Sequence, residues 1–256
     1  MAFLGAPAIA PEAAQRFTNL RRPITFHERE QEGLAEACPS RSITFWCGEQ
    51  ATFDVLTSEE VRRASVLAVL THGLYDDASE LPAHIALAPS SRCPDGLVGH
   101  TVLTTYGERF PADVLLLSCG TARGPARVGD DAVAHLGRTF LGLGARSVML
   151  ASNEVARGPA LKLAATYLES CASGQTTRAQ ALRLARRSLA SETRTRHPFY
   201  WAHLQLLGLG LERPAPVAPR SAPAPSGSWL PLAAAVAGIG AIVLGAWWLR
   251  RRRSSA

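Results

Sequence analysis

Continuous apolar runs that stop at small polar residues are the clearest pattern along this chain. One run, within residues 112–124, ends at Cys119; a second, within residues 65–73, ends at His72; and a third covers residues 145–152. An unbroken apolar run closed by turn residues is typical of a strand buried on both faces of a parallel sheet. The sequence therefore predicts three such strands, and two of them end at side chains that can do chemistry.

Segments with helical character alternate with these strands. Helices are expected at residues 12–20, 27–37, 57–64, 97–106, 130–143, 158–172 and 176–190, and further strands at residues 43–46, 85–88 and 199–208. This alternation predicts an α/β fold in which helices cover both sides of a mostly parallel central sheet. Both the odd and the even positions of residues 199–208 are largely apolar. We therefore expect the last strand to be buried on two faces.

The chain divides into a folded region and an appendage. Residues 42–211 are interpreted as the core domain, and residues 1–41 as its N-terminal part or as an extension. The start of the chain is mildly apolar but lacks a basic leader, so no signal peptide is predicted. Residues 212–228 are rich in Pro, Ala and Ser and are expected to form a semi-rigid, extended linker.

After the linker, the sequence predicts a membrane span. Residues 229–249 carry no charge, and tryptophans stand at both ends of this segment. A helix of this length covers about 30 Å, the thickness of the hydrocarbon core of a bilayer, and tryptophan is enriched at bilayer interfaces. A buried core helix is the alternative, but no folded sequence remains to bury it. Residues 250–256 form a basic tail that stops the span.

Two arguments about the orientation of the span oppose each other. Four arginines in the tail favour a cytoplasmic tail, which would place the domain outside the cell. The missing signal peptide and the unpaired pattern of the cysteines favour a cytoplasmic domain. We expect the second arrangement, a single-pass protein of the cell membrane with a cytoplasmic domain, because a span near the C-terminus can insert after synthesis.

Charge argues against nucleic acid as a partner of the domain. The formal net charge of the whole chain is +6, but residues 1–211 hold 21 Lys and Arg against 20 Asp and Glu. A nearly neutral domain lacks the basic footprint of nucleic-acid binding. We therefore expect a protein substrate or a regulatory protein as the partner, together with the membrane through residues 229–249.

Cysteine and glycine spacing argue against metals and cofactors. The five cysteines form no CxxC pair, which disfavours a zinc site and a disulfide framework and fits a reducing compartment. Residues 120–129 contain three glycines but neither of the common phosphate-binding patterns. No metal and no cofactor is expected.

His72 and Cys119 are the candidate catalytic pair. Neighbouring parallel strands bring their carboxyl ends to one sheet edge, and there an imidazole can activate a thiol for attack on a carbonyl. Gly73 would let a backbone N–H approach the developing oxyanion, and Gly120 would leave the nucleophile uncrowded. The alternative for Cys119 is a buried structural thiol. No catalytic role is assigned to Cys47, Cys93, Cys171, His84, His100, His135, His197 or His203.

Several of these segments together resemble the CHAT domain family, caspase-like cysteine peptidases of the caspase and separase clan. The matching segments, in family order, are LTHGLYD (residues 70–76), ADVLLLSCGT (112–121), LGRTFLGLGARSVMLAS (136–152), AQALRLA (179–185) and HPFYWA (197–202). The resemblance implies a caspase-like three-layer α/β/α fold. It also implies that His72 is the catalytic histidine and Cys119 the nucleophile.

The sequence departs from the family pattern at two places near the expected site. Ser118 stands directly before Cys119 where relatives usually carry Ser-Ala-Cys, and residues 153–159 replace the usual Leu-Trp and acidic residue after the third strand. Since that loop lies near the expected substrate cleft, the specificity of relatives cannot be carried over. No tetratricopeptide array precedes the domain, so partner recognition must come from elsewhere.

Two function classes are compatible with the sequence. The first is a membrane-tethered cysteine endopeptidase that cleaves a partner protein as an effector or regulator. The second is a catalytically silent, caspase-like adaptor at the membrane. Retention of both His72-Gly73 and Cys119-Gly120 favours the first, and the unusual loop at residues 153–159 favours the second. A nucleotide-binding α/β domain is a third option, disfavoured by the missing phosphate motif.

Overall fold

The computed structural model of the chain describes residues 1–17, 20, 23–76, 81–106, 109–122 and 135–217. The chain separates into two compact units, Met1–Ala218 and Pro219–Ala256. The second unit, with the predicted membrane span at residues 229–249, lies outside the described residues. Within the described part of the chain, no helix has both the length and the apolar character that crossing a bilayer requires. The span therefore stays a prediction.

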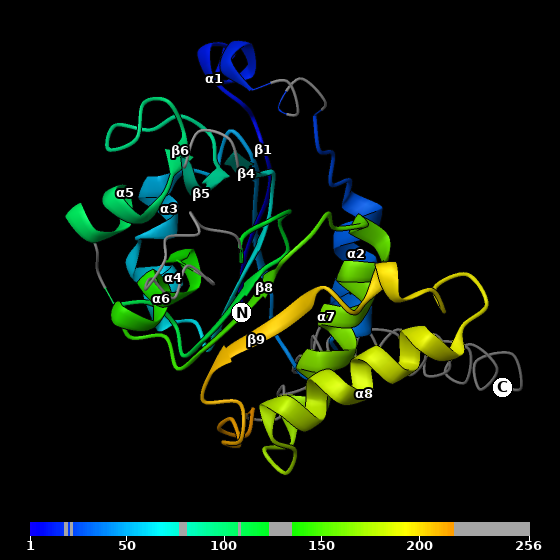
Figure 1. Ribbon diagram of the computed structural model, residues 1–256. Helices are drawn as coiled ribbons and strands as arrows, with labels where there is room; N and C mark the ends of the chain where they lie inside the picture. The colour runs from blue at the N-terminus through cyan, green and yellow to red at the C-terminus, as the bar shows by residue number, and fades with distance from the viewer. Residues whose placement is uncertain (18–19, 21–22, 77–80, 107–108, 123–134, 218–256) are drawn as a thin grey trace, which may run out of the picture. The chain divides into compact units, whose positions relative to one another are not determined.

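Strands and helices alternate through the first unit, as Figure 1 shows. The strands are β1 (Ala2–Pro7), β2 (Thr44–Gly48), β3 (Val66–Leu70), β4 (Gly73–Asp76), β5 (Leu81–Ala86), β6 (Leu97–Val98), β7 (Asp113–Leu116), β8 (Ser147–Ala151) and β9 (Leu204–Gly208). The helices are α1 (Pro11–Arg16), α2 (Glu28–Ala37), α3 (Phe53–Leu56), α4 (Glu59–Arg63), α5 (His100–Thr105), α6 (His135–Gly142), α7 (Arg157–Ala172) and α8 (Arg178–Ser191), with a 3-10 turn at Pro198–Tyr200. The beginning of the helix expected at residues 130–143 lies outside the described residues.

The central sheet has six strands in the order β2-β1-β3-β7-β8-β9. The first five are parallel, and β9 pairs antiparallel with β8. The predicted mostly parallel sheet is confirmed, and so is the prediction that the strands leading to His72 and Cys119 are neighbours, because β3 pairs directly with β7. The alternating topology with one antiparallel strand fits a caspase-like fold.

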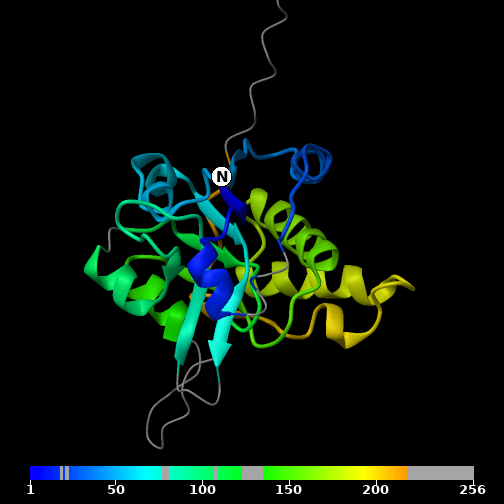
Figure 2. The ribbon, with the colours of Figure 1, turned by 90° about the horizontal axis from the view of Figure 1, so that it is seen from above.

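Helices cover both faces of this sheet, which gives three layers (Figure 2). Strand residues alternate between the two faces, because successive side chains of a strand point in opposite directions. Phe3 and Ala68 pack with α2, α7 and α8, whereas Leu4 and Val69 pack with α3, α4, α5 and α6. The central strands β3, β7 and β8 are buried along their whole length, as their continuous apolar runs predict.

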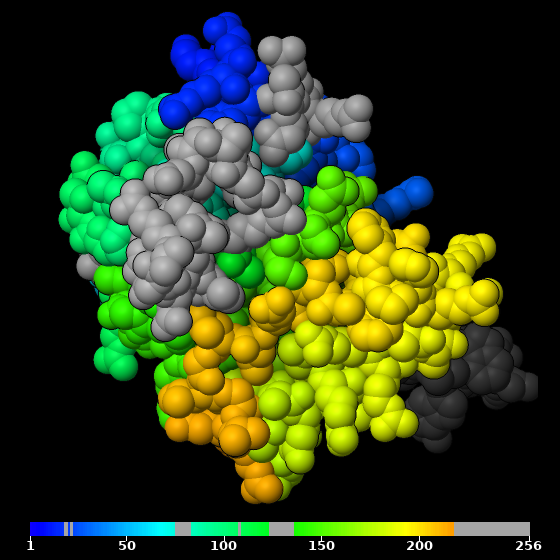
Figure 3. All heavy atoms as spheres, viewed as in Figure 1, coloured from blue at the N-terminus to red at the C-terminus, as the bar shows by residue number. Residues whose placement is uncertain are grey.

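The last strand is shorter and more exposed than the sequence predicts. The expected strand at residues 199–208 begins with the 3-10 turn Pro198–Tyr200, and only Leu204–Gly208 is a strand. Gln205 and Gly208 are exposed, since β9 is the edge of the sheet. It lies beside α8 on the molecular surface (Figure 3). Burial on two faces, inferred from the apolar odd and even positions, is therefore wrong for this strand.

The N-terminus contributes a strand that the sequence pattern does not reveal. All six residues of β1 are buried, and the strand lies between β2 and β3. It pairs in parallel with both neighbours, with Phe3 opposite Phe45 on one side and Ala68 on the other. Residues 1–41 thus include an interior strand of the central sheet.

A second, three-stranded sheet follows β3. Its order is β4-β5-β6, and its strands pair antiparallel. Sequence reasoning treats residues 75–110 as one long connection with a short strand at residues 85–88 and a helix at residues 97–106. The structure instead places a strand at Leu81–Ala86, and the helix α5 begins after the short strand β6.

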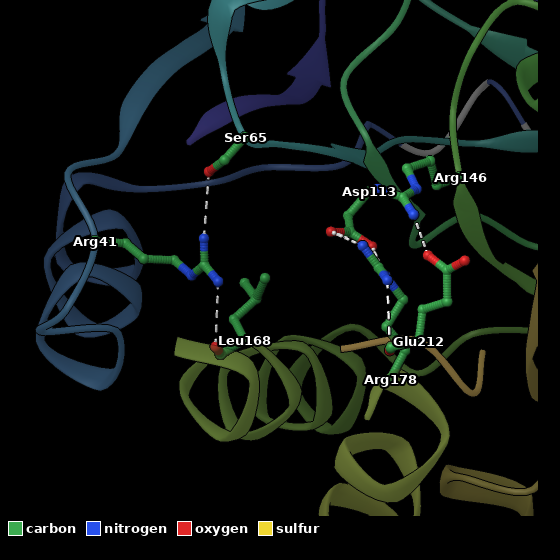
Figure 4. A network of polar contacts seen from close by, with 7 residues as sticks. All are labelled: Arg41, Ser65, Asp113, Arg146, Leu168, Arg178 and Glu212. Atoms are coloured by element: carbon green, nitrogen blue, oxygen red, sulfur yellow. Dashed lines mark hydrogen bonds and ion pairs between the residues drawn. The ribbon is translucent and has the colours of Figure 1, made fainter. Parts of the chain in front are cut away.

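Arginines gather at the amino edge of the central sheet, opposite the edge where β3 and β7 end (Figure 4). Arg178 at the start of α8 is 2 % exposed and forms a forked pair with Asp113, the first residue of β7. Arg146 pairs with Glu212 across the neighbouring loops. Because burial of one unpaired charge is costly, the Arg178–Asp113 pair fixes the first turn of α8 to the sheet.

Candidate active site

The carboxyl ends of β3 and β7 meet in direct backbone contact. A Cβ on Gly73 would lie 1.7 Å from the carbonyl oxygen of Cys119, a separation that no side chain can occupy. The residue after His72 therefore has to be glycine for the two strand ends to approach this closely. The structure brings the backbones of His72-Gly73 and Cys119 together, as the pairing of β3 with β7 predicts.

Hydrogen bonds hold the end of β3 in place. The Thr71 N–H donates to Ser118 Oγ at 3.4 Å, and the Thr71 hydroxyl donates to the Ala86 carbonyl. The Ala86 N–H in turn donates to the His72 carbonyl at 3.0 Å. Ser118 and the small sheet thus fix the backbone on both sides of His72, whose side chain is half-buried.

The turn after β7 is tied to the loop that follows β8. Gly120 has φ +62°, in the left-handed region that favours glycine, and its N–H donates to the Asn153 carbonyl at 3.1 Å. The Val155 N–H donates to Cys119 Sγ at 3.3 Å. These contacts orient the thiol and make the unusual loop at residues 153–159 a direct neighbour of it. Sequence reasoning places this loop near the cleft but does not reveal its bond to sulfur.

Gly120 has a structural role that sequence reasoning does not reveal. Its conformation closes the turn that carries Cys119, and its N–H is already engaged by Asn153. A role of this N–H in oxyanion binding would require Asn153 to give up that bond. The Gly73 backbone lies directly against the Cys119 backbone.

Burial suppresses the reactivity of the four cysteines outside the candidate pair. Burial raises the pKa of Cys38 and Cys171 to about 11 each, and burial together with Asp95 raises the pKa of Cys93 to about 12. Burial also raises the pKa of the half-buried Cys47. Because the thiolate is the reactive form, these four thiols are poor nucleophiles at neutral pH.

The described residues contain no group of three or more His, Cys, Asp and Glu side chains arranged to hold a metal ion. All five cysteines are free thiols. Among them, Cys119 at the carboxyl edge is half-buried.

Gly73→Ala is expected to lower the free energy of unfolding by at least about 2 kcal/mol, because the new methyl group would collide with a rigid backbone carbonyl. Urea unfolding followed by circular dichroism measures the loss. Gly33→Ala in α2 is the matched control, since a Cβ there meets nothing within 4 Å and alanine favours the helix. Equal stabilities of the two variants would contradict the close contact between Gly73 and Cys119.

The three-layer fold, with a histidine and a cysteine at the ends of adjacent parallel strands, defines a caspase-like, peptidase-related module. The sequence model of the CHAT domain matches residues 3–209, which is most of the chain. The chain belongs to the CHAT domain family, and the family predicted from the sequence motifs is confirmed. No curated protein matches the chain.

Proposed function

We propose that this protein is a cysteine endopeptidase in which Cys119 is the nucleophile and His72 the general base. The observation that carries the proposal is the contact between Gly73 and the Cys119 carbonyl. Because His72 directly precedes Gly73, His72 and Cys119 stand at adjoining strand ends. Family membership supports the same pair, because CHAT domains are related to caspase-like cysteine peptidases. The proposed substrate is a partner protein.

The proposed reaction has two chemical stages. His72 takes the thiol proton, and Cys119 Sγ forms a bond to the scissile carbonyl carbon while the carbonyl oxygen becomes an oxyanion. His72 then returns the proton to the leaving amine as the peptide C–N bond breaks. A water molecule, deprotonated by His72, hydrolyses the thioester and regenerates the thiol. The Gly73 N–H is the proposed backbone donor to the oxyanion.

A catalytically silent adaptor is the second candidate, and one observation favours it. Two hydrogen bonds join the loop at residues 153–159 to the nucleophile and its turn. The Val155 N–H donates to Cys119 Sγ, and the Asn153 carbonyl accepts from the Gly120 N–H. While this loop holds the Gly120 N–H, that N–H is not available to an oxyanion, which favours a module that binds without cleaving. In the adaptor, the carboxyl edge would serve as a binding surface only.

Alkylation kinetics distinguish the two functions without a substrate. We expect iodoacetamide at pH 7.5 to modify Cys119 in the full-length protein at least about tenfold faster than the other four cysteines, because the proposed base His72 would activate its thiol, whereas burial raises the pKa of the other four. Peptide mapping over time measures each rate. His72→Ala should slow the reaction at Cys119 and leave the reaction at the half-buried Cys47 unchanged. Slow, equal modification of all five thiols would reject the activated nucleophile and favour the adaptor.

We also propose that residues 229–249 tether the domain to the cell membrane, with the domain on the cytoplasmic side. The support is the uncharged sequence of this segment between tryptophans and a basic tail. Full-length protein is expected to remain in the membrane pellet after alkaline carbonate extraction, whereas a variant that ends at residue 217 should appear in the supernatant. Release of the full-length protein by carbonate would contradict an integral span.

A further inference from the structure

The amino edge of the central sheet holds a cleft of about 710 Å³. It lies where β3 and β7 begin, at the end of the sheet opposite His72 and Cys119. Five arginines and one carboxylate are among its lining residues: Arg41, Arg62, Arg109, Arg146, Arg178 and Asp113. Residues 214–217, the last described part of the chain, line its other side.

Three of these five arginines form an ion pair with a carboxylate. Arg178 pairs with Asp113, Arg146 with Glu212, and Arg62 with Glu59. Within the described residues, Arg41 and Arg109 have no carboxylate partner. No Asp or Glu follows Glu212 in the sequence. Among the described residues, the cleft thus holds two arginines that form no ion pair.

Burial of the guanidinium costs more free energy at Arg41 than at Arg109, because Arg41 is buried and Arg109 is exposed. It is only 5 % exposed, and its guanidinium makes two long hydrogen bonds, from Nη1 to Ser65 Oγ and from Nη2 to the Leu168 carbonyl, both 3.4 Å (Figure 4). Its Nε is buried without a hydrogen-bond partner among the described residues. The nearby Glu169 carboxylate accepts from the Ser40 hydroxyl at 2.6 Å. A buried polar N–H without an acceptor is unfavourable, and an anionic ligand in the cleft would supply the acceptor that this guanidinium lacks.

Arg109 is exposed, but its stem is held in place. A Cβ on Gly144, which has φ +96° and lines the same cleft, would lie 2.9 Å from Arg109 Cγ. The side chain thus lies flat on the glycine that precedes β8. Guanidinium groups bind phosphate oxygens in a forked, bidentate geometry and keep their charge at any physiological pH.

We propose that this cleft is a binding site for a small oligophosphate, with Arg41 and Arg109 as the groups that contact the phosphates. The volume lies in the range of pockets that hold small molecules. Several arginines around one cleft suit a ligand with several negative charges better than a single carboxylate. The phosphates belong to a nucleotide or to a free inorganic chain. This site uses side chains rather than a glycine-rich phosphate loop, so the missing phosphate motif does not argue against it.

Calorimetric titration of the full-length protein in mild detergent tests the proposal. The probes are inorganic tripolyphosphate, ATP and sulfate. Saturable binding of tripolyphosphate with Kd below about 100 µM, and binding of sulfate at least about tenfold weaker, is expected. ATP that binds more tightly than tripolyphosphate would identify a nucleotide as the source of the phosphates, and equal or weaker binding of ATP would identify the phosphate chain alone. The absence of saturable tripolyphosphate binding would overturn the proposal.

Two matched variants separate this site from general attraction between charges. Arg109→Ala removes an exposed side chain from the cleft and should weaken tripolyphosphate binding at least about tenfold. Arg183→Ala removes an equally exposed arginine from α8, outside the cleft, and should leave the Kd unchanged. Equal effects of the two variants would overturn the proposal. Because the readout is binding alone, the result is independent of whether Cys119 is catalytic.

Discussion

For the proposed peptidase, replacement of Cys119 by alanine is expected to lower the rate of cleavage of a partner protein by at least about a thousandfold. Loss of the sulfur removes the covalent route, and a thousandfold loss corresponds to about 4 kcal/mol of transition-state stabilisation. His72→Ala should cause a loss of similar size, because the two residues act as one unit. The double variant should therefore be no slower than either single variant.

The measurement needs a cleavable protein, and the product of a neighbouring gene, co-expressed with the peptidase, is the practical choice. Cys47→Ala is the matched control, because Cys47 is the other half-buried thiol and should keep most of the activity. Thermal unfolding of each variant separates loss of chemistry from loss of fold. Cleavage that persists in Cys119→Ala would show that this pair is not the catalytic dyad.

Asp113→Ala is expected to destabilise the domain by about 3 to 5 kcal/mol, because it leaves Arg178 charged and unpaired at 2 % exposure. For a domain of this size, the melting temperature should fall by about 10 °C. Differential scanning calorimetry measures the melting temperature of each variant. The companion change Asp113→Leu with Arg178→Met should recover most of the loss, since an apolar pair of similar volume has no charge to desolvate.

Glu59→Ala is the matched control for this experiment. Glu59 pairs with Arg62 and Arg63 on the surface of α4, with its side chain 59 % exposed. Such exposed pairs contribute at most about 1 kcal/mol. If Asp113→Ala costs no more than Glu59→Ala, the buried pair does not fix α8 to the sheet.

The interior strands could be predicted from the sequence, because burial on both faces leaves a continuous apolar run. β3, β7 and β8 carry such runs, and their prediction is confirmed. β1 is buried to the same extent, but its sequence, AFLGAP, contains Gly5 and Pro7 and no β-branched residue. Strand propensity is therefore weak there, and only pairing with β2 and β3 makes the segment a strand.

The error at the last strand has a different physical cause. Apolar residues on both sides of residues 199–208 satisfy the same pattern as an interior strand, but an edge strand beside a helix can also carry them half-exposed. Pro198 starts a 3-10 turn instead, and the strand begins only at Leu204. The apolar pattern identifies which residues are apolar, but it does not distinguish an edge strand from an interior strand that has a neighbour on both sides.

The meeting of the two strand ends at the candidate site could be predicted from the sequence, but the contacts made there could not. The strand ends at His72 and Cys119 follow from the apolar runs, since adjacent parallel strands end at one edge. The bond from the Val155 N–H to Cys119 Sγ joins residues 36 positions apart, and no local pattern encodes it. The collision that forbids a side chain at Gly73 likewise depends on the register between β3 and β7.

The position of β1 has a consequence for how the chain tolerates cutting. This strand comes from the first seven residues, yet it joins β2 to the rest of the sheet. A protease that removed it would detach β2 and turn β3 into an open edge of unpaired backbone groups. Open edges recruit strands from other molecules, which leads to aggregation. Loss of the first few residues would therefore replace the partly exposed edge strand β2 by β3, whose residues are all buried in the intact sheet, and so favour self-association.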